Sequence, residues 1–237
     1  MKSKFLTALI ILSTLITSNL FASEKDVYEF SWLDPDKEVY VLQNRKFRKA
    51  DNVYVNLGGG ITTSGAFVDS TSIQGRAGYF VTEDWGIELV YAKNSGQEND
   101  TAKAVRASNG GGTGTTPFRR IVENYMGGML VWSPFYSKIN TFNKIIYMDW
   151  IFGVGLAQLE EHNNKLRFTV GQSQEGVETL EKHTGLIWEA GMKFFLTENW
   201  STRVDLTGVH YQATQVSLTG KAYYSNFDAT FSLGYTF

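Results

Sequence analysis

Apolar and polar residues alternate without a break over the C-terminal segment Asn226–Phe237. One side carries only apolar and aromatic residues and the other only polar residues and glycine: Phe227, Ala229, Phe231, Leu233, Tyr235 and Phe237 against Asn226, Asp228, Thr230, Ser232, Gly234 and Thr236. Because successive side chains of a strand point to opposite faces, this pattern predicts a strand with one apolar face. A tilted strand needs about 9–11 residues to cross a bilayer, and this segment is long enough. A strand of a soluble sandwich would show the same alternation, so the rest of the chain has to decide.

The same period of two recurs along the chain and predicts seven further strands. Their approximate ranges are 53–62, 73–81, 85–94, 120–132, 144–158, 183–196 and 200–212. In the range 120–132 both faces are fairly apolar around Met129, Leu130 and Val131, so the facing of that strand stays open.

A six-residue segment occurs twice. FVTEDW at 80–85 recurs as FLTENW at 195–200. Strand-like residues precede and follow each copy, so each predicts a hairpin turn, which pairs Val81 with Trp85 and Leu196 with Trp200. Both tryptophans then lie on the apolar face, as in the aromatic girdle of a membrane barrel. We predict such a girdle from Trp85, Trp200, Tyr235 and Phe237.

Short and long connections alternate between the predicted strands. Turns at 82–84 and 197–199 and an intermediate one at 133–143 alternate with longer polar segments, notably 95–117 and 159–182. Short periplasmic turns and longer outer loops give this rhythm in membrane barrels. An open sheet edge would leave backbone groups unpaired in lipid, so the sheet has to close. We therefore predict an all-β fold, an eight-stranded antiparallel transmembrane β-barrel over residues 53–237, with both ends on the periplasmic side.

Residues 1–22 are predicted to be a signal peptide that is cleaved after Ala22. Lys2 and Lys4 precede an apolar run that is shorter than the roughly 20 residues of a spanning helix. An uncleaved anchor is the alternative. Residues 23–52 are charged and without a clear period, which predicts a periplasmic N-terminal arm. This arm is either a solvated tail or a segment that docks on the barrel mouth, on peptidoglycan or on a periplasmic partner.

Composition argues against several classes of protein. The formal net charge is −2, from 22 basic and 24 acidic residues, which argues against a polybasic nucleic-acid binder. The chain has no cysteine and so has neither disulfides nor thiolate metal sites. Its 23 glycines, 3 prolines and 14% aromatic residues suit many long strands.

Several motifs together resemble a known family. They are WLDPDKEVYVLQNRKFRK at 32–49, NVYVNLGGG at 52–60, the TEDWG turn at 82–86 and the terminal aromatic residue. With these motifs the chain resembles the bacterial outer-membrane β-barrel domain family of Gram-negative cells, from about residue 26 to the end. The resemblance implies a porin-like barrel in the cell outer membrane. It also implies that Phe237 belongs to the signal read by the barrel-assembly machinery.

Charged residues on the predicted inward faces are the candidate site: Arg76, Glu88, Asp149, Glu189, Lys193, Arg203, Asp205 and Asp228. The predicted registers place Gly78 opposite Glu88 and Gly191 opposite Asp205. Side chains fill the interior of an eight-stranded barrel, so we predict that these charges pair into a structural network in the lumen. A proton path, an ion path or a narrow pore is the alternative.

Histidines are the candidates for chemistry. His162, His183 and His210 have no serine or metal-ligand partner at a characteristic spacing in the sequence. We therefore predict no catalytic, metal or cofactor site and no nucleic-acid partner. The predicted protein is a monomer with a structural or interaction role in the cell envelope. The alternatives are a small passive channel for ions or apolar solutes and a surface adhesin that acts through its outer loops.

Overall fold

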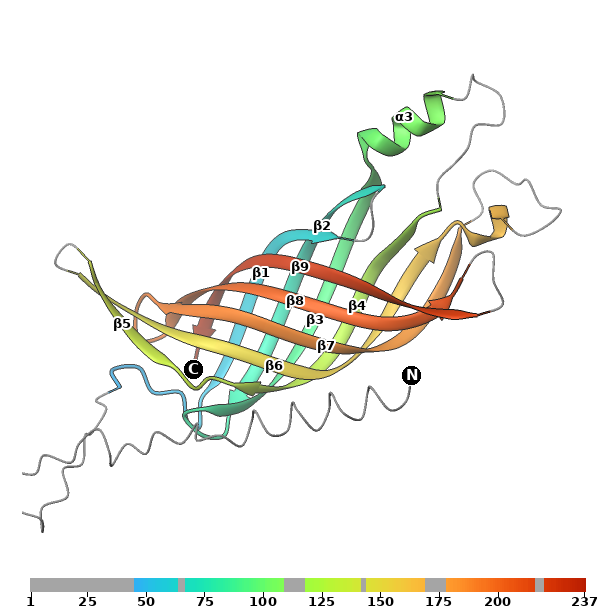
Figure 1. Cartoon of the computed structure of the whole chain (residues 1–237). Helices are drawn as coiled ribbons and strands as arrows, with labels where there is room; N and C mark the ends of the chain where they lie inside the picture. Colours follow the sequence, from blue (N-terminus) through green and yellow to red (C-terminus); the bar gives the residue numbers. More distant parts are fainter. Residues whose placement is uncertain (1–44, 64–66, 109–117, 142–143, 169–177, 216–219) are drawn as a thin grey trace, which may run out of the picture. The chain divides into compact units, whose positions relative to one another are not determined.

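The computed structural model describes residues 45–63, 67–108, 118–141, 144–168, 178–215 and 220–237. In this part of the chain one sheet has nine strands (Figure 1): β1 Val53–Thr63, β2 Val68–Phe80, β3 Trp85–Glu98, β4 Arg120–Trp132, β5 Tyr136–Thr141, β6 Lys144–Asn163, β7 Thr179–Phe195, β8 Trp200–Thr214 and β9 Lys221–Thr236. A helix, α3 (Asp100–Ser108), follows β3, and a 3₁₀ turn, η1 (Lys165–Phe168), follows β6. The predicted signal peptide, and the predicted arm as far as residue 44, lie outside the described residues. No described helix is both long and apolar enough to cross a bilayer.

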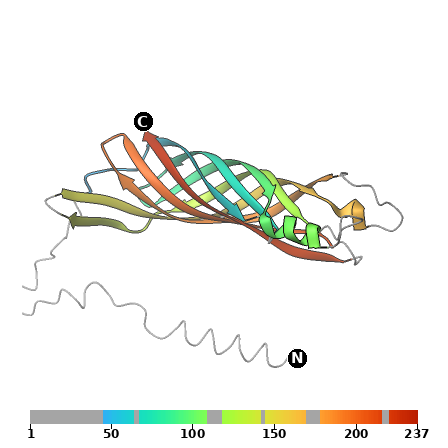
Figure 2. The same ribbon diagram turned by 90° about the horizontal axis from the view of Figure 1, so that it is seen from above.

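Eight of these strands close into a barrel. Neighbours run in the order β4-β3-β2-β1-β9-β8-β7-β6, and β4 also pairs with β6 from Trp132↔Phe152 to Arg120↔Asn163. Every pair is antiparallel, and Figure 2 shows the strands tilted around a common axis. The structure therefore confirms the predicted eight-stranded antiparallel barrel. The remaining strand, β5, pairs with β6 alone among the described strands.

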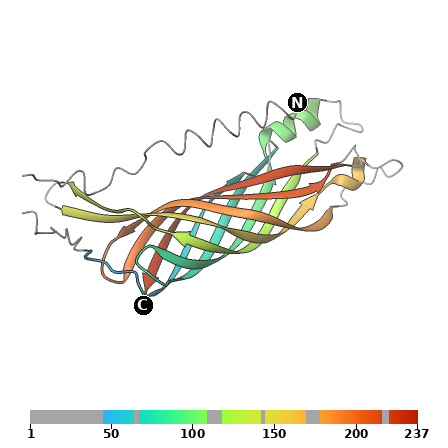
Figure 3. The ribbon, with the colours of Figure 1, turned by 60° about the horizontal axis from the view of Figure 1, so that its bottom comes forward.

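The two ends of the barrel differ. One end, here called the turn end, carries the turns at 81–84 and 196–199 and the C-terminal Phe237 (Figure 3). The opposite end, here called the loop end, carries α3 and η1. This arrangement agrees with the predicted alternation of short turns and long loops.

Apolar side chains face outward from the barrel and polar ones inward. In β9, Phe231 is 59% exposed and Leu233 47%, whereas Thr230 and Ser232 are 4% and 5% exposed. The same alternation follows β1, β2, β3 and β8. A wall with an apolar outer face suits a surrounding of lipid rather than water.

The facing of β4, which the sequence left open, is set by a β-bulge. The register with β6 shifts between Val122 and Asn124. A bulge inserts one extra residue, so inward positions change from even to odd numbers along the strand. Val122 and Tyr125 are consequently both buried, and Met126 is exposed. No period of two over the whole strand describes its two faces.

The repeated six-residue segments form equivalent turns, as predicted. The observed registers pair Tyr79 with Ile87 and Met192 with Val204. In the first copy the Val81 amide donates to the Trp85 carbonyl at 2.9 Å, and the Leu196 amide donates to Trp200 at the same distance in the second. A threonine hydroxyl completes each turn, because Thr82 Oγ1 and Thr197 Oγ1 accept from the Trp85 and Trp200 amides at 3.0 Å.

Replacing Thr82 by valine should therefore destabilise the barrel slightly. The loss of this hydrogen bond is expected to lower the free energy of unfolding by about 1 kcal/mol, and Thr82→Ser, which keeps the hydroxyl, should stay close to wild type. Urea unfolding in phospholipid vesicles, followed by tryptophan fluorescence, measures both variants. Equal losses for the valine and serine variants would contradict a role for the hydroxyl.

Several strands extend at the loop end into segments predicted as connections. β3 runs to Glu98 and α3 follows it, β6 runs to Asn163, and β2, β7 and β9 begin at Val68, Thr179 and Lys221. In addition, β5 lies inside the predicted turn 133–143. Outside a bilayer the outward face of a strand need not be apolar, whereas its backbone hydrogen bonds continue. The apolar period therefore covers less than the whole strand, and the strands predicted from the sequence are too short at the loop end. Asn99 caps α3 by accepting the Ala102 amide at 2.9 Å on its Oδ1.

Candidate functional site in the barrel lumen

Five charged side chains meet at the centre of the lumen and are here called the arginine–carboxylate cluster: Arg76 (β2), Glu88 (β3), Glu189 (β7), Arg203 and Asp205 (β8). All five side chains form ion pairs within the cluster, and each is at most 2% exposed. Arg203 contacts three carboxylates, with 2.6 Å to Glu88, 3.0 Å to Glu189 and 2.6 Å to Asp205. Arg76 contacts Glu88 at 2.8 Å and also pairs with Glu189. The cluster thus joins four strands across the lumen.

Neutral groups and glycines complete this cluster. The Tyr54 hydroxyl donates to Glu88 at 2.6 Å, and Arg76 donates to Thr207 Oγ1 at 2.7 Å. A Cβ atom at Gly153 would lie 2.7 Å from Glu189 Cγ, and one at Gly191 would lie 2.1 Å from an Asp205 oxygen. These two glycines therefore provide the space into which the carboxylate side chains fold.

Asp228 forms a separate polar group next to the cluster. Its carboxylate accepts hydrogen bonds from three neutral donors, at 2.6 Å from the Tyr125 hydroxyl and 2.8 Å from both Gln74 and Asn226. Gln74 also accepts a hydrogen bond from Arg76 at 3.0 Å, which connects the two groups. The sequence indicated Asp228 but neither Tyr125 nor Gln74.

An apolar layer is present in the lumen that the sequence analysis did not predict. It consists of eleven buried residues: Val90, Ala92, Val122, Tyr125, Met129, Ala157, Leu159, Ile187, Val209, Tyr211 and Ala213. The sequence contains a signal for this layer. Its members occupy inward positions of strands whose outward positions are also apolar, and apolar residues on both faces indicate an apolar section of the lumen. The lumen thus contains a charged layer and a packed apolar layer.

The described part of the N-terminal arm packs against the turn end. Lys49 is 2% exposed, and its ammonium lies 2.8 Å from Asp149 and 2.7 Å from the Ser133 hydroxyl. Phe47 stacks on Phe195, with ring centroids 4.7 Å apart, and Arg45 pairs with Asp84 at 3.0 Å. Burial lowers the pKa of Lys49, and the Asp149 charge opposes this effect.

Asp149 and Lys193 therefore lie apart from the arginine–carboxylate cluster. Asp149 pairs with Lys49 of the arm, a residue that the sequence analysis did not single out. The Lys193 ammonium lies 5.2 Å from the centre of the Tyr54 ring and 5.1 Å from that of Phe195. Aromatic faces attract a cation in this position.

Aromatic side chains form a belt around the outside of the turn end, here called the turn-end belt: Trp85, Trp132, Trp150, Phe152, Trp200, Tyr235 and Phe237. Trp85 stacks on Trp132 with centroids 5.9 Å apart. Tyr235 packs edge-on against Trp200 at 5.2 Å and against Phe237 at 5.0 Å. The structure thus places all four predicted girdle residues on one outer rim.

His210 meets a serine in the structure, which the sequence did not indicate. Its Nδ1 lies 2.7 Å from Ser225 Oγ, and Trp188 Nε1 donates to its Nε2 at 2.8 Å. An indole nitrogen only donates, so Nε2 carries no proton and Nδ1–H donates to the serine. A general base would have to accept the serine proton at that same nitrogen. The arrangement therefore does not match that of a serine hydrolase.

The other two histidines lie near the loop end. His162 Nε2 is 2.6 Å from Glu123, and the His183 ring stacks on Tyr211 with centroids 5.3 Å apart. His183, Glu161 and Glu181 form the one group of metal-ligating side chains in the described residues. Arg120 pairs with Glu161 at 2.9 Å and Lys165 with Glu181 at 3.3 Å, so both carboxylates already have a cationic partner.

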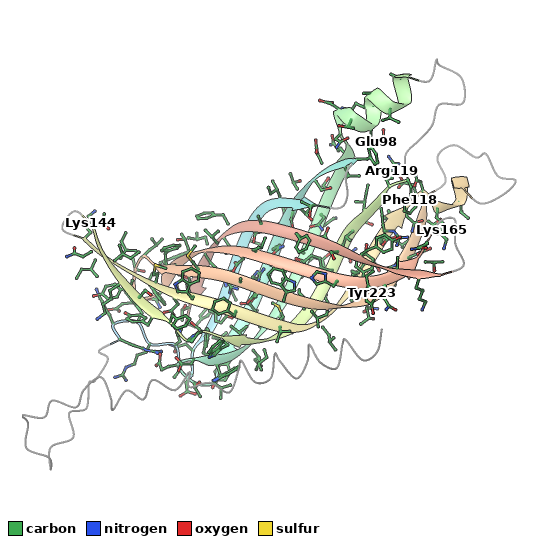
Figure 4. All side chains as sticks on the ribbon, viewed as in Figure 1. Glu98, Phe118, Arg119, Lys144, Lys165 and Tyr223 are labelled. Carbon is green, nitrogen blue, oxygen red and sulfur yellow. The ribbon has the colours of Figure 1, made fainter. Side chains whose placement is uncertain are left out.

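A cavity of about 190 Å³ opens beside this group. Phe67, Phe118 and Tyr224 line it, and the Arg120 guanidinium lies over the Tyr224 ring at 4.2 Å. Figure 4 shows Phe118 and Arg119 together at the loop end, and Arg119 pairs with Glu98 and Glu178. The cavity is therefore at the barrel mouth, next to ion pairs that join strand ends.

Comparison with known proteins gives a family match. Residues 43–237 match the family described as the outer membrane protein beta-barrel domain. A search of curated protein sequences found no match.

Solved structures of outer-membrane barrels are also similar. The N-terminal β-barrel domain of Pseudomonas aeruginosa OprF is 16% identical, with a TM-score of 0.47, over 79% of this chain and 98% of that one. Neisserial surface protein A is 12% identical, with a TM-score of 0.46, over 78% and 96%. OprG of Pseudomonas aeruginosa is 15% identical, with a TM-score of 0.44, over 81% and 98%.

Proposed function

The chain belongs to the outer membrane protein β-barrel domain family, and from this premise we propose that it is a closed, non-conducting barrel with a structural or interaction role in the cell envelope. The observation that carries the proposal is the filled lumen. The arginine–carboxylate cluster crosses it with side chains that are at most 2% exposed. An ion that entered would have to separate these buried ion pairs. Each separated pair would leave a buried charge without its partner, which costs several kcal/mol.

Two further layers support the same function. The apolar layer leaves a hydrated ion without hydrogen-bond partners, and several of its members, such as Ala92, Tyr125 and Leu159, are 0% exposed. At the turn end, Lys49 and Phe47 of the arm are 2% and 8% exposed. Charged, apolar and arm residues therefore obstruct the lumen in three different ways.

The orientation of the proposed barrel follows the family fold. The turn end faces the periplasm and the loop end faces outward, so that the turn-end belt lies at the periplasmic interface of the bilayer. Export would remove residues 1–22, the barrel-assembly machinery would read Phe237, and the barrel would act as a monomer. Interaction would then take place through the arm or through the loop end, where α3 projects from the barrel.

Planar-bilayer recording tests the closed lumen. Purified wild-type protein is expected to give no steady unitary currents, because the arginine–carboxylate cluster and the apolar layer remain in place under an applied voltage. The Lys49→Met variant should also give no currents, since it removes only the ion pair of the arm at the turn end and leaves the other two layers in place. Steady unitary currents from the wild type would contradict the proposal and favour the passive channel.

An adhesin acting through the outer loops is the second candidate. Two ion pairs of Arg119 favour an ordered surface at the loop end, because they join Glu98 of β3 to Glu178 before β7. If the loop end binds a host or matrix surface, removal of residues 100–108 should reduce cell binding while the heat-modifiable gel mobility of the barrel is retained. Unchanged binding would exclude α3 from that role.

A further inference from the structure

The β5–β6 hairpin extends beyond the closed barrel. β4 and β6 pair only as far as Trp132↔Phe152, and from there β6 pairs with β5, from Tyr136↔Asp149 to Thr141↔Lys144. Figures 1 and 3 both show this hairpin projecting obliquely beyond the turn end of the barrel. Lys144 lies at its far tip (Figure 4). In the proposed orientation, an oblique hairpin at the turn end starts at the periplasmic surface of the bilayer.

One face of the hairpin continues the outward, apolar face of β6. Counting in steps of two from Trp150, which is 39% exposed, passes Met148, which is 6% exposed, and leads to Ile146, which is 40% exposed. Ile146 pairs directly with Ile139 of β5, which is 45% exposed. Phe135, just before β5, is 56% exposed. Exposed apolar residues thus lie both in the turn-end belt and on the hairpin, separated by the pair Ser137↔Met148, whose methionine is 6% exposed.

Basic residues accompany this apolar surface. Lys138 and Lys144 of the hairpin and Lys46 and Arg48 of the arm are all exposed. The Lys46 and Lys138 ammonium groups lie 5.5 and 5.7 Å from the centre of the Tyr147 ring. The nearby acidic group Asp149 is buried and already holds Lys49 at 2.8 Å. Asp51 is the exposed acidic residue of the described arm, so the net exposed charge of the hairpin and the described arm is positive, with four basic residues against one acidic residue.

We propose that the β5–β6 hairpin lies in the interface of the periplasmic leaflet and binds anionic phospholipid headgroups. In this arrangement Ile139 and Ile146 enter the acyl boundary, while the four basic side chains contact headgroup phosphates. Apolar residues flanked by lysine and arginine are what an interfacial segment needs to bind an anionic lipid surface. The hairpin begins directly beside Phe135 and Trp150 of the lipid-facing wall. This position selects lipid over a protein partner, because a partner would have to displace lipid beside Trp150. The inference requires a barrel in the membrane but not a closed lumen.

Spin labels can test the depth of the hairpin, since the chain has no native cysteine. The full mature barrel would carry Ile146→Cys or Ile139→Cys, with Glu198→Cys in the opposite turn as a control. In vesicles that contain phosphatidylglycerol, collisions with oxygen should exceed those with a water-soluble nickel chelate several-fold at 139 and 146, and the reverse should hold at 198. Two hairpin positions on different strands keep the test decisive if one variant fails to assemble.

Two results would overturn the insertion. Nickel accessibility at 146 equal to that at 198 would mean a hydrated hairpin. Protection of 139 and 146 from both oxygen and nickel would mean a protein contact, either with a second copy or within the chain.

Charge variants of the hairpin test the binding of anionic headgroups separately. The variant Lys138→Gln with Lys144→Gln neutralises both hairpin lysines. In phosphatidylglycerol vesicles, its ratio of oxygen to nickel collisions at position 146 should fall to about the value that the wild-type charges give in purely zwitterionic phosphatidylcholine. The same ratio in both lipids for the wild-type charges would refute recognition of anionic headgroups. Planar-bilayer silence of these variants is a separate readout, so failure of this inference leaves the closed lumen unaffected.

Discussion

Replacing Arg203 with methionine is expected to lower the free energy of unfolding by about 3–5 kcal/mol, the largest effect of any single substitution considered for this barrel. The Arg203 side chain is 0% exposed and pairs with Glu88, Glu189 and Asp205. Methionine has a similar length but no charge, so it leaves three buried carboxylates with Arg76 as their cationic partner in the cluster. Urea unfolding in vesicles and the boiling-dependent gel mobility measure the loss.

A second substitution distinguishes charge imbalance from lost packing. Adding Asp205→Asn to Arg203→Met restores the original charge difference of the cluster, because Asp205 pairs with Arg203 at 2.6 Å. This double variant should recover part of the lost stability, whereas a pure packing defect would persist unchanged. An Arg203→Met barrel within about 1 kcal/mol of wild type would show that the buried pairs do not contribute in the way expected of such pairs.

Leu206→Arg on the outer face is expected to cost about 2–4 kcal/mol, the value for arginine at the bilayer midplane. On β8, Trp200 belongs to the turn-end belt and His210 lies close to Trp188 and Phe227. The segment between them spans about 33 Å along a strand and about 25 Å along the axis at a tilt near 40°, which matches the apolar band of a membrane barrel. Leu206 lies near its middle.

The neighbours of Leu206 make the comparison clean. It pairs with Ala190 and Ala229, so the longer arginine meets no steric obstacle on either side. Thr202→Arg is the matched control on the same face of the same strand, next to the turn-end belt, where arginine costs about 0–1 kcal/mol. Fraction folded in vesicles measures both. Equal losses at 202 and 206 would contradict the proposed depth of the bilayer.

The faces of most strands could be predicted because lipid imposes a strict rule on them. Phe231 and Ser232 differ in exposure, 59% against 5%, as their alternation predicts. The rule fails in β4, where the bulge at Val122/Asn124 changes the parity of the inward positions. A bulge depends on how the partner strand β6 fits, and one strand read by itself has no information about that fit.

The candidate site was predictable only as far as local hairpins reach. Hairpin registers placed Gly78 opposite Glu88 and Gly191 opposite Asp205, and the structure has both pairs. The contacts across the lumen, such as Arg76 with Glu189, join residues of β2 and β7 that share no ladder. These contacts depend on the closure and tilt of the whole barrel. The ion pair between Lys49 and Asp149 depends on them as well.

The sequence by itself determined the alternating strands, the two equivalent turns and the apolar outer wall. These features follow from local rules, since each side chain only has to match lipid or lumen. The tertiary structure alone decided how the lumen is filled, by the arginine–carboxylate cluster, the apolar layer and Lys49 of the arm. It also decided that the β5–β6 hairpin extends beyond the closed barrel. Each of these joins residues far apart in the chain, whose distances are set by the closure of β4 on β6.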